Sequence, residues 1–296
     1  MNYLIAYITK IFFVLFAYIN QINRIKIARI LGWILYKCLK FRVHIVRRNL
    51  ELCFPELSKP EREIWIQKHF KMLSLSIIDR GILWYGSPQS IKNMTHIVGI
   101  NRIKNLVNQK KRVILLMPHF LGIDAAGTRL SMELESIACI YQAQENKILD
   151  KIICAGRTRF NQVFLVENKN GLRKMIRHLN TFTPVIYLPD MDFGQNGSDF
   201  VPFFGIQAST LLTTAQLAKK LDILIFPVVV FIESNTGHYR IEILPELKDF
   251  PGNDSFKKAT ARLNVELENW IRFYPTQYYW VHRRFKTRPN KESKIY

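Results

Sequence analysis

From about residue 110 onward, short apolar runs alternate with longer segments of helical pattern, and no other feature constrains the fold as strongly. Apolar runs that predict buried strands lie at 113–117, 137–141, 163–166, 185–188 and 223–231. Helical patterns lie between and after them, at 122–134, 147–160, 171–179, 209–220 and 256–273. Apolar strands separated by helices indicate an α/β fold, with a mostly parallel central sheet flanked by helices. Residues 239–244 alternate in the way that an edge strand does.

The chain is long enough for one large domain or two small ones, because it has 296 residues. Hydrophobic residues make up 48% of it, which excludes a disordered chain. Its four cysteines are too few for a disulfide-based scaffold of this size. We find no internal repeat and no clear linker after residue 50. We therefore predict one α/β domain over 49–296, preceded by a separate N-terminal segment over 1–48.

The N-terminal segment predicts association with a membrane. Residues 3–19 read YLIAYITKIFFVLFAYI, and only Thr9 and Lys10 interrupt the apolar run. A spanning helix needs about 20 apolar residues, so this run is marginal. Basic residues interleaved with apolar ones follow as far as residue 48. Residues 1–48 therefore predict a membrane anchor and a basic amphipathic helix, which either spans the bilayer or lies in its interface. The alternative is an ordinary helix pair with a solvated basic face.

The net charge indicates an anionic partner. Lysine and arginine number 43 and aspartate and glutamate 23, so the formal charge is 43 − 23 = +20. Such a charge suits nucleic acid, a membrane surface or a phosphorylated substrate. We expect no nucleic-acid partner, because the chain has no recognition motif and its basic residues cluster around the apolar N-terminal run.

The sharpest chemical motif is Pro-His-Phe-Leu-Gly-Ile-Asp at 118–124, where a predicted strand ends and a helix begins. Ligand sites of open α/β sheets lie at the carboxyl ends of strands. We predict that His119 acts as a general base and that Asp124, in the first helical turn, bonds its other ring nitrogen. No Ser or Cys is placed as a nucleophile, so the reacting hydroxyl would belong to the substrate. The alternative is that both residues only cap their elements; we predict no metal, because no third ligand is nearby.

Five blocks in order along the chain carry a resemblance to a known family. They are RNL with CFPE at 48–56, MPHF at 117–120 with Asp124, CAGRTR at 154–159, YLPDMDFG with FVPFFG at 187–205, and WVHRRFKTRP at 280–289. Together they resemble the late acyltransferases of lipid A biosynthesis, the lauroyl and myristoyl transferases, over nearly the whole chain. Two departures stand out. Asp124 occupies a position where such members often have Glu, and Gln142 one where they often have Arg.

The resemblance implies a glycerolipid-acyltransferase-like fold in which His119 and Asp124 are catalytic. It also implies substrate-binding roles for the polar residues of the later blocks: Arg157 and Arg159 on phosphates of the glucosamine disaccharide, Asp190 and Asp192 orienting a basic residue or a sugar hydroxyl, and Arg283 and Arg284 on phosphates or the anionic membrane surface. The simpler alternatives are a solvated helix face, loop capping and a solvated basic tail.

The implied reaction transfers a fatty acyl chain from acyl-acyl carrier protein to a hydroxyl of a 3-hydroxyacyl chain on a Kdo-bearing lipid A precursor. It needs no cofactor, and helix-start amides or Arg157 would stabilise the oxyanion. The implied location is the bacterial inner membrane, with the catalytic domain on the cytoplasmic side. Two alternatives are a glycerolipid acyltransferase of the lysophosphatidate type, which Asp124 suggests, and a non-catalytic basic membrane-binding protein.

Overall fold

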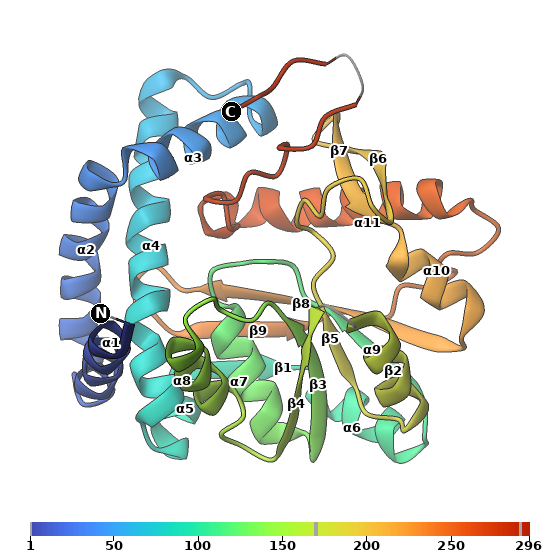
Figure 1. Cartoon of the computed structure of the whole chain (residues 1–296), viewed down its shortest axis with the longest axis horizontal. Helices are drawn as coiled ribbons and strands as arrows, with labels where there is room; N and C mark the ends of the chain where they lie inside the picture. The colour runs from blue at the N-terminus through green and yellow to red at the C-terminus, as the bar shows by residue number, and fades with distance from the viewer. Residues whose placement is uncertain (1, 169–170, 290–291) are drawn as a thin grey trace.

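A seven-stranded sheet forms the centre of the molecule in a computed structural model that describes residues 2–168, 171–289 and 292–296 (Figure 1). The strand order is β1-β9-β8-β2-β5-β3-β4. The strands are β1 (Thr95–Val98), β2 (Arg112–Leu116), β3 (Ser136–Tyr141), β4 (Gln162–Glu167), β5 (Val185–Tyr187), β8 (Ile223–Ile232) and β9 (Tyr239–Ile243). The five from β8 to β4 run parallel, β9 is antiparallel to β8, and β1 is parallel to β9. The predicted α/β fold with a mostly parallel sheet is confirmed.

The strand predicted at 239–244 is confirmed as β9, but its predicted place at the edge of the sheet was wrong. β9 lies between β8 and β1, so the edge is β1. Strand β1 has little pattern of its own, because it has four residues and two of them are exposed. A second small sheet was also missed: β6 (Ser198–Phe203) and β7 (Ile206–Leu211) form an antiparallel hairpin outside the main sheet.

Helices cover both faces of the sheet, as the alternating contacts of β2 show. Val113 and Leu115 face the cluster that contains α7 (Ile123–Glu133), whereas Ile114 and Leu116 face the cluster that contains α9 (Gly171–Asn180). Burial on both faces explains why this strand is a continuous apolar run. The remaining helices after β1 are α6 (Ile100–Asn108), α8 (Lys147–Arg157), α10 (Thr213–Lys220), α11 (Phe256–Phe273) and the short η2 (Pro275–Gln277).

Five helices precede the sheet and lie along one side of it (Figure 1). They are α1 (Asn2–Ala17), α2 (Gln21–Cys38), α3 (Lys40–Cys53), α4 (Lys59–Tyr85) and α5 (Pro88–Met94). Helix α4 begins at a capping box formed by Ser58 and Glu61, with Pro60 in the first turn.

Two glycines bring α1 and α2 close to α4. A Cβ atom on Gly32 would lie 2.6 Å from the Cα of Lys71, and one on Gly81 would lie 2.6 Å from the carbonyl oxygen of Phe13. A buried ion pair between Arg24 on α2 and Asp79 on α4, 2.7 Å apart, adds a polar link. The helices of residues 1–48 therefore share the core of α4.

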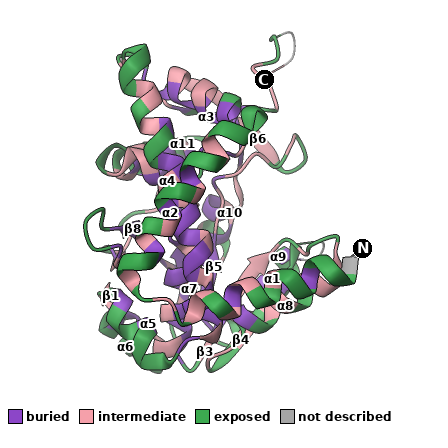
Figure 2. Cartoon of the chain, turned by 90° about the vertical axis from the view of Figure 1, so that its left-hand side faces the viewer, coloured by how far each residue is buried: buried purple, intermediate pink, exposed green. Residues whose placement is uncertain are grey.

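Many residues of α1 and α2 are exposed (Figure 2). A number of these exposed residues are apolar. Tyr3 is 80% exposed, Tyr7 65% and Trp33 61%. Of the helices in the described ranges, none combines the length and the apolar character needed to cross a bilayer. The anchoring role of residues 1–48, and their separation from 49–296, stay predictions.

Candidate active site

The sheet brings His119 and Asp190 together. Strands β2 and β5 are parallel neighbours, and Leu116 pairs with Tyr187 in their register. His119 and Asp190 each lie three residues beyond this pair, because 119 − 116 and 190 − 187 are both 3. Parallel neighbours end at the same edge of a sheet, so the two loops meet there.

Asp190 holds His119 by two hydrogen bonds. The Oδ1 atom of Asp190 lies 2.7 Å from Nδ1 of His119, and its Oδ2 accepts the backbone N–H of His119 at 2.9 Å. The carboxylate is almost completely buried. Burial opposes its charge, but His119 beside it lowers the pKa of Asp190 to about 2. A charged acceptor at Nδ1 makes that nitrogen the donor, which leaves the lone pair of Nε2 to take a proton.

The predicted hydrogen bond between His119 and Asp124 was wrong. Asp124 lies in the first turn of α7, as expected, but it accepts Nε of Arg80 at 2.8 Å and Nε of Arg157 at 2.9 Å. Burial opposes its charge, and these two guanidinium groups lower the pKa of Asp124 to about 2. The error arose because proximity in sequence suggested the partner, whereas the neighbouring strand supplies a carboxylate that already occupies Nδ1.

Arg157 is held by close packing between two helices as well as by Asp124. It ends α8, and a Cβ atom on the preceding Gly156 would lie 2.4 Å from the Trp84 ring of α4. Asp124 thus joins α7 to α4 through Arg80 and to α8 through Arg157. Arg80 was missed by the sequence reasoning, although a charged pair at 79–80 inside an apolar helical stretch is a usable signal.

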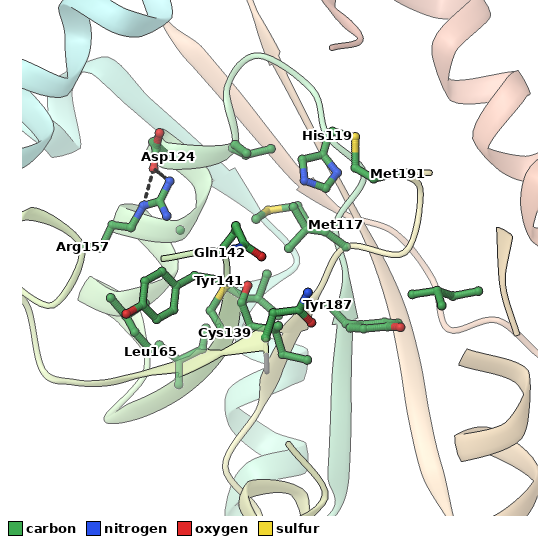
Figure 3. Close-up of a pocket in the computed structure, with 18 of the residues that line it drawn as sticks. Met117, His119, Asp124, Cys139, Tyr141, Gln142, Arg157, Leu165, Tyr187 and Met191 are labelled. Atoms are coloured by element: carbon green, nitrogen blue, oxygen red, sulfur yellow. Dashed lines mark hydrogen bonds and ion pairs between the residues drawn. The ribbon is translucent and has the colours of Figure 1, made fainter. Parts of the chain in front are cut away.

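A cavity of about 690 Å³ opens beside these residues (Figure 3). His119, Asp124 and Arg157 line it together with Gln142, which follows β3. Most of its wall is apolar, with side chains that include Ile123, Ile137, Ile140, Val163, Leu165, Leu172, Ile186, Leu188 and Phe193. A mainly apolar cavity with a few polar groups is typical of a small-molecule site, and this one suits a hydrocarbon chain.

The other predicted site residues lie outside the wall of this cavity. Arg159 donates to the carbonyl oxygens of Leu83 and Gly86 at the end of α4. Asp192 accepts from the backbone and hydroxyl of Thr287, which corresponds to the alternative of loop capping.

The two arginines of the C-terminal block have different surroundings. The guanidinium of Arg283 lies 4.7 Å from the ring centre of Phe41. Arg284 is only 1% exposed and donates to the carbonyl of Ser209 and the hydroxyl of Thr210. The structure therefore places Arg284 in the core rather than on a surface open to phosphate. A sequence shows two adjacent arginines but not which of them points inward.

The amides near His119 are already occupied. The N–H groups of His119, Phe120, Leu121 and Ile123 each donate to an oxygen within the protein. The expectation that helix-start amides stabilise an oxyanion therefore has little support at these four positions. Arg157, which lines the cavity, is the better placed of the two expected groups.

Comparisons with known proteins agree with the block pattern. Residues 1–287 match the family described as bacterial lipid A biosynthesis acyltransferase. The chain is 33% identical to the lipid A biosynthesis lauroyltransferase of Escherichia coli over 260 residues, covering 88% of this chain and 84% of the relative. It is 30% identical to the palmitoleoyltransferase of the same organism over 259 residues, covering 87% and 83%. It is 27% identical to the myristoyltransferase over 248 residues, covering 84% and 76%.

The match extends over nearly the whole chain, and a buried carboxylate–histidine pair beside an apolar cavity is chemistry that acyl transfer can use. The chain is an acyltransferase and belongs to the bacterial lipid A biosynthesis acyltransferase family.

Proposed function

We propose that this protein transfers a fatty acyl chain from acyl-acyl carrier protein to a hydroxyl of a 3-hydroxyacyl chain on a Kdo-bearing lipid A precursor. The observation that carries the proposal is the His119–Asp190 pair, whose histidine lines a mainly apolar cavity. The names of the relatives support lipid A biosynthesis as the setting.

In the proposed reaction His119 is the general base. Its Nε2 takes the proton of the acceptor hydroxyl as that oxygen attacks the thioester carbonyl carbon. Asp190 stabilises the imidazolium that forms. When the tetrahedral intermediate collapses, the carbon–sulfur bond breaks and the new ester remains. The proton then passes from His119 to the leaving thiolate, so the enzyme returns to its starting state.

Arg157 is the proposed partner of the negative charge that develops on the carbonyl oxygen. Two guanidinium groups, those of Arg80 and Arg157, share the single carboxylate of Asp124, so one positive charge remains uncompensated beside the cavity. A fixed cation in a partly buried site stabilises an oxyanion more than water does. The same charge also suits a phosphate of the acceptor.

Net charge and exposed surface support the proposed acyl donor and the proposed location. Acyl carrier proteins are acidic, and the +20 charge of this chain favours their approach. The exposed apolar faces of α1 and α2 carry basic residues among them, including Lys10, Lys26, Arg29 and Lys37. We place these faces in the headgroup region of the inner membrane on its cytoplasmic side.

Competition between acceptors tests the reaction. Purified protein with radiolabelled acyl-acyl carrier protein should acylate the Kdo-bearing precursor and not lysophosphatidic acid. His119→Ala should lower that rate by about 100-fold or more, the usual size of a general-base contribution. Acylation of lysophosphatidic acid alone would favour a glycerolipid acyltransferase, and wild-type rates in a folded His119→Ala variant would remove the mechanism.

Flotation with vesicles that contain anionic lipid tests the location. Replacing Tyr7 and Trp33 with Ser should reduce the bound fraction, because both side chains are more than half exposed. Phe273→Ser is the matched control, since this side chain is 77% exposed on α11. Equal binding of the wild type, the Tyr7 and Trp33 variant and the Phe273→Ser control would argue against the proposed membrane face.

A further inference from the structure

The C-terminal segment after α11 contacts both loops that carry the catalytic pair. The backbone N–H of Tyr279 donates to the carbonyl oxygen of His119 at 2.9 Å, and that of Leu121 donates to the carbonyl oxygen of Gln277 at 2.8 Å. A short antiparallel bridge between Phe120 and Tyr278 accompanies these bonds. The chain is thus held at His119 and at the two residues that follow it.

The same segment holds the loop of Asp190. Thr287 donates to the carboxylate of Asp192 with its backbone N–H at 2.7 Å and its hydroxyl at 2.8 Å. The backbone N–H of Asp192 in turn donates to Nε2 of His282 at 3.0 Å. The phenol of Tyr278 donates to the carbonyl oxygen of Asp190 at 3.3 Å. These contacts fix the backbone on which the Asp190 carboxylate is mounted.

His282 must be uncharged to accept this bond, because a protonated imidazole has no free lone pair. Burial, and then the positive charge of Arg284, lower the pKa of His282 to about 4. The acceptor is therefore present at neutral pH. No other role of His282 is needed to explain its position behind the Asp190 loop.

The C-terminal segment is itself anchored in the core, so it is able to hold the His119 and Asp190 loops in fixed positions. The Asn49 side chain on α3 donates to the carbonyl oxygens of Trp280 and His282, at 2.7 and 2.8 Å. Gln277 makes paired bonds with the backbone of Ile232 at the end of β8. Three distant parts of the chain thus meet behind the two catalytic loops.

We propose that residues 277–287 form a brace that positions Asp190 against His119, with His282 and Thr287 as positioning residues. Neither side chain lines the cavity, so the brace acts through the catalytic pair and not through the substrate. The proposal rests on the proposed function, in which His119 is the general base.

The test compares variants of His282 in the full-length enzyme. His282→Leu removes the acceptor for the Asp192 N–H and should lower kcat by about 10- to 100-fold, the scale of a small misplacement of a catalytic group. KM for the acyl donor should stay within about twofold, because the cavity wall is intact. His282→Gln keeps an oxygen near the position of Nε2 and should restore most of the activity. Thr287→Val removes one of the two bonds from Thr287 to Asp192 and should produce a smaller loss of the same kind.

Two controls separate positioning from general instability. Ile103→Ala removes a fully buried side chain of α6, which contributes no residue to either loop, and should lower the melting temperature without a comparable loss of kcat. In a His119→Ala background, His282→Leu should cost no further activity, because the base that it positions is already gone.

The outcomes are distinguishable. Wild-type kcat in a folded His282→Leu variant, or a full additional loss in the His119→Ala background, overturns the brace. If instead His119→Ala itself keeps wild-type rates, the proposed general base fails first, and the brace fails with it. Failure of His282→Gln to recover activity while the protein stays folded also counts against the brace.

Discussion

At the residue scale, two buried carboxylates near one cavity have different partners and therefore different roles. Asp190 bonds a histidine, whose charge changes during proton transfer, whereas Asp124 bonds two guanidinium groups, whose charge does not change. We therefore assign Asp190 to the stabilisation of His119 in the proposed mechanism. Asp124, whose catalytic role stays a prediction, is placed to orient Arg157.

Asp190→Asn should lower kcat strongly, by about 100-fold or more. An amide oxygen still accepts from Nδ1 of His119, but it has no charge with which to stabilise the imidazolium. Steady-state rates of acyl transfer, with circular dichroism to check folding, measure the effect. Asp124→Glu, which keeps the carboxylate on a longer side chain, is the comparison and should keep partial activity. If Asp190→Asn were fully active and Asp124→Asn inactive, the assignment of the two carboxylates would be reversed.

Arg157 should tolerate neither Ala nor Lys well. Arg157→Ala removes the cation. Arg157→Lys keeps the charge but loses the planar guanidinium, which bonds Asp124 through one edge and leaves its other N–H groups available to the substrate. We expect kcat/KM for the Kdo-bearing acceptor to be lowest in Arg157→Ala, intermediate in Arg157→Lys and highest in the wild type. Equal values for the three proteins would mean that this guanidinium serves packing alone.

At the element scale, helix α7 supplies both a charged residue and an open stretch of cavity wall. Gly127 lines the cavity, and a Cβ atom added there meets nothing within 4 Å. The space beside this turn of α7 is therefore available to a ligand, and the side chain at position 127 sets how much of it remains.

Gly127→Leu should shift donor preference toward shorter acyl chains, because the new side chain occupies the cavity without displacing the protein. Relative rates with acyl-acyl carrier protein donors of graded length give the measurement, and Gly127→Ala should shift the preference less. An unchanged preference with Leu would mean that the acyl chain lies elsewhere.

At the scale of the whole molecule, two histidines with lowered pKa values should each lower the stability as the pH falls from 6.5 to 4. His69 is completely buried with Nδ1 2.9 Å from the carbonyl oxygen of Thr276, and burial lowers its pKa to about 4 despite that bond. In the unfolded chain its pKa is about 6.5, so the unfolded state binds the extra proton first as the pH falls. The pKa of His282 is also lowered to about 4, so its protonation lowers the stability in the same pH range. Each contributes at most about 3 kcal/mol of lost stability by pH 4.

Urea unfolding of wild type and His69→Gln at pH 7 and pH 4.5 tests this dependence. The loss of unfolding free energy between the two pH values should be smaller in the variant by about 2 kcal/mol. Asp124 and Asp190 add nothing in this window, because their pKa values are lowered and the stability they contribute is lost only below about pH 4. An equal loss of unfolding free energy between pH 7 and pH 4.5 in both proteins would mean that His69 does not stay neutral in the fold.

The sequence by itself determined the class of fold, the position of His119 at a strand end and the family. Period and length of apolar runs identify buried strands, and the ordered blocks identify the family, because both are local properties of the chain. Strand β1 and the β6–β7 hairpin escaped detection, since they are short and partly exposed and gain their stability from neighbours rather than from their own pattern.

Only the tertiary structure decided the partners of the candidate site residues. His119 bonds Asp190, 71 positions away, because β2 and β5 are neighbours in the sheet, and sequence alone does not order strands. Arg80, on a helix that precedes the whole sheet, bonds Asp124 because α4 packs against α7. Arg284 is buried while Arg283 lies against a ring, although the two are adjacent in the chain. Strand order, helix packing and burial depend on contacts between segments far apart in the sequence, and those contacts decided which partner each of these side chains has.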